Sequence, residues 1–197
     1  NMCSQLPPEQ VRQGGKTLVY TKFLEDLVAK ENTSAMRIKA HAHYEGKEPY
    51  AQDWHEARRL FEKILAKTGH SYAATSLGYI AYYGRCREGE PDYEAAFRYF
   101  SYAGMQEDLE ANYKLVDLIS EGKGIWKNTA AAYNLIYKLY RREREYYCKG
   151  EPRRFADVAL RMGRAEEQGW SSRIFVNPEK GYRRYLEARF AIQRRLQ

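Results

Sequence analysis

Histidine and cysteine are the side chains of this chain whose types could support metal binding or nucleophilic chemistry. His41 and His43 lie two positions apart, so on a helix they point to different sides and cannot chelate one metal ion. Cys3, Cys86 and Cys148 lie far apart, are odd in number and form no CxxC pair. We therefore expect no zinc site and no disulfide framework, and we expect the cysteines as free thiols in a reducing compartment.

Catalytic motifs are missing from the 197 residues, which hold neither a nucleophile with a supporting base nor a recognisable catalytic pair of carboxylates. The segment Gly122-Lys123-Gly124 is rich in glycine, as phosphate-binding loops are, but the rest of the Walker pattern is missing. We interpret these glycines as the end of a helix. The sequence thus predicts a protein that is not an enzyme, with no catalytic residue, no metal and no cofactor.

Tyrosine is unusually frequent, with 18 copies in the chain. A tyrosine offers a large contact area and one hydroxyl, and it loses little entropy on binding, which is typical of binding hot spots. We predict that tyrosines beyond those needed for packing contribute to a groove that binds a peptide or a helix of a partner protein. Packing in the core is the alternative for each single residue. The candidates are Tyr44, Tyr79, Tyr82, Tyr83, Tyr113 and Lys114.

Positive charge is concentrated near the end of the chain, whose net charge is +7. Residues 1–140 hold 18 Lys and Arg against 18 Asp and Glu, whereas residues 141–197 hold 15 against 8. An arginine-rich surface could bind nucleic acid or an acidic partner, and this is our alternative function. Interleaved glutamates at helical spacing also fit an ordinary solvated surface. The candidates are Arg141, Arg142, Arg153, Arg154, Arg183, Arg194 and Arg195.

Composition places the chain among globular proteins, because 44% of its residues are hydrophobic and 30% are charged. No apolar run approaches the roughly 20 residues of a membrane span, and the first eight residues lack the hydrophobic stretch of a signal peptide. The sequence therefore predicts a cytoplasmic protein that does not contact a membrane. The oligomeric state does not follow from the sequence.

A pattern of two parts occurs four times along the chain and predicts the elements that carry these residues. The first part is an apolar run that ends in glycine, at Gly46, Gly84, Gly122 and Gly169. The second part begins with a capping residue, at Asp53, Asp92, Asn128 and Asn177. A small residue follows four positions later, at Ala57, Ala96, Ala132 and Gly181. The glycines are expected to end one helix and the Asp or Asn residues to begin the next, so each unit is a helix pair.

Local details support the same prediction. We expect Glu56 to complete a capping box with Asp53, and Pro178 follows Asn177 at the first helical position. The small residue of each second helix is expected to let its partner helix approach closely. The units repeat about every 38 residues, and the last one is delayed by an insertion at residues 141–152, where the preceding helix is expected to continue.

These patterns resemble Sel1-like repeats (SEL-one-like repeats), bacterial and eukaryotic relatives of tetratricopeptide repeats. The resemblance is carried by residues 77–84 with 92–100, by Gly122-Lys123-Gly124-Ile125 with Asn128, and by residues 177–188, which look like the second helix of such a repeat. It covers about residues 33–196. His43 and Glu166 stand where the first helix usually has an aromatic residue, which suggests that the outer units act as caps.

The resemblance implies an all-α fold, an α-solenoid with a right-handed superhelical twist, about four antiparallel helix-pair repeats and a concave surface that binds proteins or peptides. It also implies that the protein acts as an adaptor or a scaffold. Some secreted relatives carry a disulfide in each repeat and are linked to penicillin binding, but this chain lacks those cysteine pairs, so we do not extend that activity to it.

Two segments lie outside the repeat pattern. Apolar residues within 16–30 recur at helical spacing and predict an amphipathic helix that caps the first unit, after a loose leader at residues 3–15. The loop at residues 170–176 could occupy the concave face. The predicted domains are therefore 1–32, leader and capping helix, and 33–197, the solenoid, with units of about 33–70, 71–107, 108–150 and 151–197.

Overall fold

The computed structural model describes residues 8–151, 154–170 and 176–196, and this part of the chain contains nine helices and no strand. The helices are α1 (Pro8–Ala29), α2 (Thr33–Glu45), α3 (Trp54–Thr68), α4 (Ser71–Tyr82), α5 (Tyr93–Met105), α6 (Leu109–Glu121), α7 (Thr129–Cys148), α8 (Phe155–Gln168) and α9 (Pro178–Arg195).

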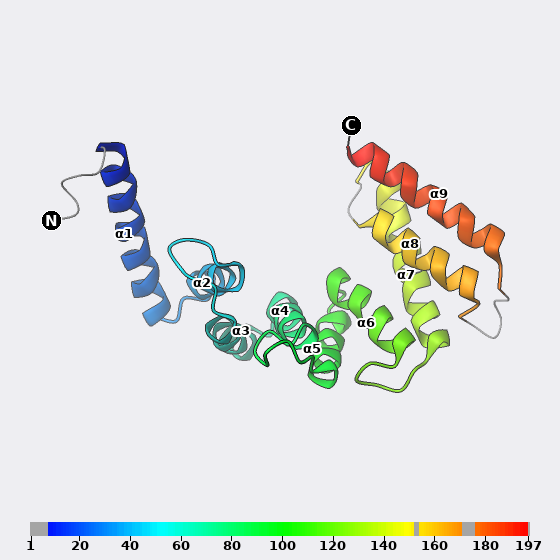
Figure 1. Cartoon of the computed structure of the whole chain (residues 1–197), viewed down its shortest axis with the longest axis horizontal. Coiled ribbons are helices and arrows are strands. Elements are labelled where there is room, and N and C mark those ends of the chain that lie inside the picture. The colour runs from blue at the N-terminus through cyan, green and yellow to red at the C-terminus, as the bar shows by residue number, and fades with distance from the viewer. Residues whose placement is uncertain (1–7, 152–153, 171–175, 197) are drawn as a thin grey trace.

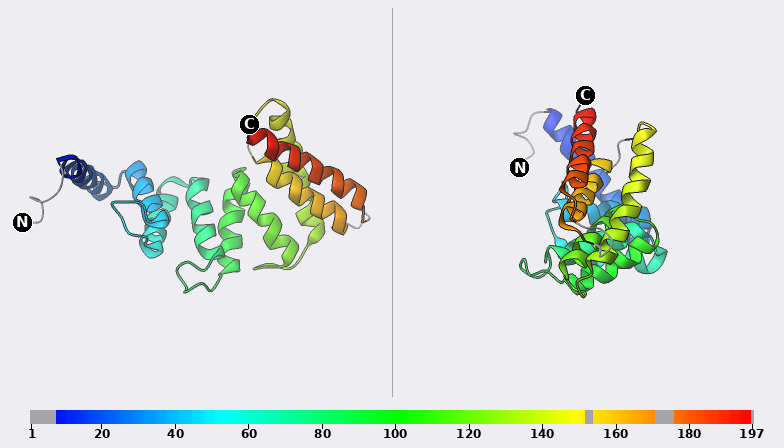
Figure 2. Two further views of the ribbon diagram at one scale, coloured as in Figure 1. Left: turned by 45° about the horizontal axis from the view of Figure 1, so that its top comes forward. Right: turned by 90° about the vertical axis from the view of Figure 1, so that its right-hand side faces the viewer.

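Successive helices pair as α2 with α3, α4 with α5, α6 with α7 and α8 with α9, and each pair packs on the next. Figure 1 shows the pairs along an arc, with α2 and α4 on its inner side, α3 and α5 on its outer side, and α1 and α9 rising at the two ends. Figure 2 shows the same stack from two further directions. The predicted all-α solenoid of four helix pairs is confirmed.

The predicted N-caps are all present. The side-chain oxygens of Asp53, Asp92, Asn128 and Asn177 accept the backbone N–H three residues later, at 2.9–3.0 Å. Each therefore satisfies one of the amide donors that a helix start leaves unpaired. Pro178 follows as the first residue of α9. The predicted capping box does not form: the Asp53 N–H donates to the His43 carbonyl at 2.9 Å, and the Glu56 carboxylate instead pairs with Arg59 at 2.6–2.7 Å.

Three of the four predicted C-terminal glycines cap their helices. Gly46, Gly122 and Gly169 are left-handed and donate their N–H to the helix carbonyl four residues earlier. The prediction for Gly84 is wrong by one residue: Tyr83 caps α4, and Gly84 follows at φ +60°. A Cβ at Gly84 would lie 2.4 Å from the backbone of Glu90, so glycine is required by the loop that folds back there.

Close packing within the helix pairs rests on small residues in both helices. Ala57, Ala96, Ala132 and Gly181 are buried, as expected. A Cβ at Gly78 of α4 would lie 2.6 Å from the Phe100 ring, and one at Gly163 of α8 would lie 2.5 Å from the Tyr185 ring. The missing Cβ of the first helix thus makes room for an aromatic ring of the second.

The hydrophobic interior is divided into three clusters that follow one another along the solenoid rather than forming one central core. Phe61, Phe100 and Phe155 are fully buried, one in each cluster. Each cluster draws residues from neighbouring helices, as expected for a repeat protein whose units contact only their neighbours.

The N-terminal helix is longer than predicted and packs less extensively against the first helix pair. It begins at Pro8, so the described residues 8–15 of the expected loose leader are helical. Leu24 is buried, whereas Leu18, Val19 and Phe23 are 72%, 71% and 61% exposed. Only the C-terminal half of α1 reaches the first helix pair, because the helix projects beyond the end of the solenoid (Figure 1).

The predicted continuation of the second helix in unit three is confirmed, since α7 runs to Cys148. Most of the loop at residues 170–176, whose occupation of the concave face was considered, lies outside the described residues, as do Cys3 and Arg153. Cys86 and Cys148 are free thiols.

Candidate functional site

Four of the six predicted partner-binding residues come together where α4 meets α6. The Lys114 ammonium lies 5.7, 4.7 and 5.6 Å from the ring centres of Tyr79, Tyr82 and Tyr83. These are cation–π distances, and they join the second unit to the third. Tyr83 is the most accessible of the three rings, 46% exposed, because it follows the end of α4.

Tyr79 and Tyr82 also contribute to the packing of the solenoid. Their rings meet Phe100 edge-on at centroid distances of 5.3 and 6.5 Å. The Tyr79 hydroxyl donates a 3.0 Å hydrogen bond to Glu110, and burial together with this carboxylate raises the pKa of Tyr79. These two tyrosines therefore contact both the buried Phe100 ring and the Lys114 ammonium.

Tyr113 stands apart from this group and is covered by a cation of the fourth unit. The Arg161 guanidinium lies 3.7 Å from its ring centre and donates to its hydroxyl. Arg161 also makes two hydrogen bonds to Asp117, at 2.8 and 2.5 Å. Burial raises the pKa of Tyr113 to about 12. This side of the Tyr113 ring is thus already occupied within the chain.

Tyr44 reaches the Lys114 group through Arg85, a residue that the sequence did not single out. The Arg85 guanidinium lies 4.3 Å from the ring centre of Tyr44, 5.7 Å from Trp54 and 5.2 Å from Tyr83. Arg85 follows Gly84 in the loop after α4, so it extends from the second unit toward the first. No sequence signal could have identified it, because two of its three aromatic neighbours, Tyr44 and Trp54, come from the preceding repeat.

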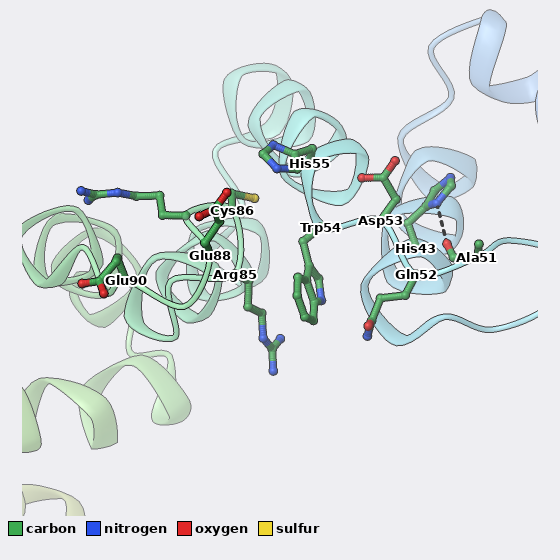
Figure 3. A pocket seen from close by; sticks show the side chains of 11 residues that line it. His43, Ala51, Gln52, Asp53, Trp54, His55, Arg85, Cys86, Glu88 and Glu90 are labelled. Atoms are coloured by element: carbon green, nitrogen blue, oxygen red, sulfur yellow. Dashed lines mark hydrogen bonds between the residues drawn. The ribbon is translucent and has the colours of Figure 1, made fainter.

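A cavity of about 910 Å³ lies beside Arg85, between the loop that precedes α3 and the loop that follows α4. Figure 3 shows the Arg85 guanidinium beside the Trp54 ring, away from the carboxylates of Asp53, Glu88 and Glu90 on the cavity wall. Within the described part of the chain, no group of three His, Cys, Asp or Glu residues is placed to hold a metal ion.

The arginine-rich alternative surface is partly neutralised by carboxylates of the chain itself. Arg142 pairs with Glu143 at 3.3 Å, and Arg183 pairs with Glu179 at 2.6 Å. Arg154 pairs with Glu110 and, at 3.3 Å, with Asp157. Among the other candidates, Arg141 and Arg195 are exposed and Arg194 lies 5.5 Å from the Tyr147 ring centre. Both candidate surfaces remain predictions.

No protein-family model and no curated protein sequence matches this chain. Among solved structures, it superimposes with a TM-score of 0.68 on a Sel1 repeat protein from Oxalobacter formigenes, at 17% identity, over 93% of this chain and 68% of that one. It also superimposes with a TM-score of 0.64 on a protective antigen of uropathogenic Escherichia coli strains that displays an SLR fold, at 20% identity.

The second superposition covers 84% of this chain but 32% of the antigen, so the chain spans about a third of that protein's length. At these identities the comparisons establish the fold, and the chain has the helical solenoid fold of Sel1 repeat proteins. Among the helices of the described residues, none combines the length and the apolar composition that a membrane span requires.

Proposed function

We propose that this chain is a protein-interaction module of the adaptor or scaffold type, without enzymatic activity. It binds a peptide or a helix of a partner protein on a concave, tyrosine-rich surface formed by the first helices of its repeats. One observation carries the proposal: Tyr83 is 46% exposed although Tyr79, Tyr82 and Lys114 hold its ring in place.

The Tyr83 ring, held in place by its neighbours, is suited to binding a partner protein. Tyr79 stacks on Tyr83 at 6.1 Å with an angle of 6° between the rings, and Tyr82 meets it edge-on at 5.0 Å. A preorganised aromatic side chain loses little conformational entropy when a partner covers it. The Sel1-repeat fold supports the proposal as well, since solenoids present extended concave surfaces on which other proteins can lie.

A matched pair of tyrosines allows a direct test. Tyr137 of α7 is 43% exposed and stacks on Tyr133, so it resembles Tyr83 in exposure and in support but belongs to a second helix. A photo-crosslinking amino acid is placed at position 83 or at position 137 of the full chain, and crosslinked products from a lysate of the source organism are identified by mass spectrometry.

We expect a protein that crosslinks at position 83 and not at position 137, that is unaffected by nuclease, and whose capture is lost in Tyr83→Ala but not in Tyr137→Ala. Crosslinking of the same proteins at both positions would contradict a specific surface. Capture that disappears with nuclease, survives Tyr83→Ala and falls steeply with salt would instead support the arginine-rich surface of residues 141–197 as a nucleic-acid site.

A further inference from the structure

We propose that Arg85 and Lys114, which share Tyr83 as a neighbour, form a binding site for carboxylates of an acidic peptide segment. The proposal rests on the proposed function and specifies the chemistry of the partner. Arg85 and Lys114 lie 5.2 and 5.6 Å from the Tyr83 ring centre, and Tyr83 is itself exposed. An incoming chain that covers Tyr83 therefore meets both cations.

Arg85 is held by aromatic rings and lacks an anionic partner. Tyr44, Trp54 and Tyr83 surround its guanidinium, and its Nη1 atom is buried without a hydrogen-bond partner. It forms no ion pair with any carboxylate of residues 18–151, 154–170 and 176–196. A buried charged donor without a partner carries an energetic cost that an incoming carboxylate would relieve.

Lys114 has the same character. Three tyrosine rings surround its ammonium, its one hydrogen bond is a long contact of 3.5 Å to the Tyr83 hydroxyl, and it too forms no ion pair within the described residues. Rings attract a cation but do not neutralise it, so the positive charge of both side chains is available to a ligand.

Two other cations of the solenoid also lie over tyrosine rings, but carboxylates neutralise their charge. Arg161 and Arg184 also lie over tyrosine rings, at 3.7 Å from Tyr113 and 4.6 Å from Tyr140. Arg161 pairs with Asp117 at 2.5 Å, and Arg184 pairs with Glu166 at 3.2 Å. The cation over tyrosine is thus a recurring feature, and the pair around Tyr83 differs because no carboxylate of the described residues lies within ion-pair distance of Arg85 or Lys114.

The geometry also limits the ligand. Because both cations lie close to one ring centre, they are no more than about 11 Å apart. An extended peptide advances about 3.3 Å per residue, so two acidic residues separated by one or two others span this distance. The planar fork of Arg85 suits bidentate contact with one carboxylate, and the compact ammonium of Lys114 suits the other.

The test uses the full chain and a fluorescein-labelled octapeptide of alternating Glu and Ala, with the Gln counterpart as the neutral probe. Fluorescence anisotropy gives each Kd. We expect the Glu peptide to bind at least tenfold more tightly than the Gln peptide and to weaken as salt rises. Arg85→Gln/Lys114→Gln should weaken the Glu peptide about tenfold or more.

Lys63→Gln/Arg98→Gln is the matched control, because it removes one lysine and one arginine that are exposed on second helices. It should change the Kd by less than twofold, and circular dichroism verifies that both variants fold. The proposal is overturned if the wild type binds both peptides equally or not at all, or if the control weakens binding as much as the site variant.

Failure of this proposal can be told apart from failure of the proposed function. Random decapeptides displayed on phage are selected on the full chain and tested again on Tyr83→Ala. Peptides that need Tyr83 but are no more acidic than the library would leave the interaction module in place and refute the carboxylate site. If no peptide is selected, both proposals fail. An octathymidylate that binds and is lost in Arg85→Gln/Lys114→Gln would show a phosphate site and refute the peptide ligand.

Discussion

Removing the Glu166 carboxylate should destabilise the last helix pair strongly, because this group is fully buried and ion-paired. Glu166 is 0% exposed, with Arg184 Nε and Lys180 Nζ each 3.2 Å from one of its oxygens. In the repeat pattern Glu166 aligns with Ala81 and Ile119, and Arg184 aligns with Tyr99 and Leu135. The fourth unit thus has an ion pair where the second and third have uncharged residues.

The expected loss of stability depends on the interactions that Arg184 retains when Glu166 is removed. Breaking a buried ion pair by deleting one partner costs about 3–5 kcal/mol, because the other charge is left uncompensated. Arg184 retains a 2.8 Å hydrogen bond to the Tyr140 hydroxyl and a 3.3 Å contact with Glu187, and its side chain is 21% exposed. We therefore expect Glu166→Ala to cost about 3 kcal/mol, at the lower end of that range.

The compensating variant is Glu166→Ile/Arg184→Leu, which installs the residues that the third unit has at these positions. Replacing a buried ion pair with apolar residues of similar volume is often neutral or stabilising, so the double variant should recover most of the loss. Urea denaturation measures the free energy of unfolding without screening charges, and hydrogen exchange of α8 and α9 locates the change.

Glu179→Ala is the matched control, since it removes an exposed carboxylate that also pairs with an arginine of α9. It should leave the free energy of unfolding almost unchanged. The reasoning is refuted if Glu166→Ala costs no more than Glu179→Ala, or if the double variant is less stable than the single one.

Three further predictions concern the fold. Gly78→Ala should cost about 1–3 kcal/mol in urea denaturation, because its Cβ would collide with the buried Phe100 ring, although alanine favours a helix. Asn128→Ala should cost about 1 kcal/mol by removing the N-cap of α7, measured in the same way. Burial alone would raise the pKa of Glu25, but hydrogen bonds from Lys39 and Tyr50 outweigh it and lower the pKa below its usual 4.5. The stabilisation of α1 docking by Glu25 is therefore complete above pH 4.5 and is lost as pH falls through the lowered pKa. Hydrogen exchange of α1 should become faster at acid pH for this reason in the wild type and not in Glu25→Gln.

Much of the architecture could be predicted because it depends on local chemistry. Asp53, Asp92, Asn128 and Asn177 cap helices through hydrogen bonds that span only three residues, so their spacing revealed four helix pairs. Predictions from the sequence were less accurate for features that depend on tertiary packing. The start of α1 and the exposure of Leu18, Val19 and Phe23 depend on how far the helix projects beyond the first pair, which periodicity does not show.

For the candidate site, too, some features could be predicted from the sequence and others could not. The fold class, the helix pairs and the tyrosines near the ends of first helices could all be inferred from the order of the residues. The packing of the repeats in three dimensions places Lys114 among Tyr79, Tyr82 and Tyr83 and joins Tyr44 to this group through Arg85. It also leaves both cations without a carboxylate partner within the described residues. The physical reason is that the offset between stacked repeats is set by side-chain packing, which brings together residues such as Tyr83 and Lys114, 31 positions apart, that no local rule relates.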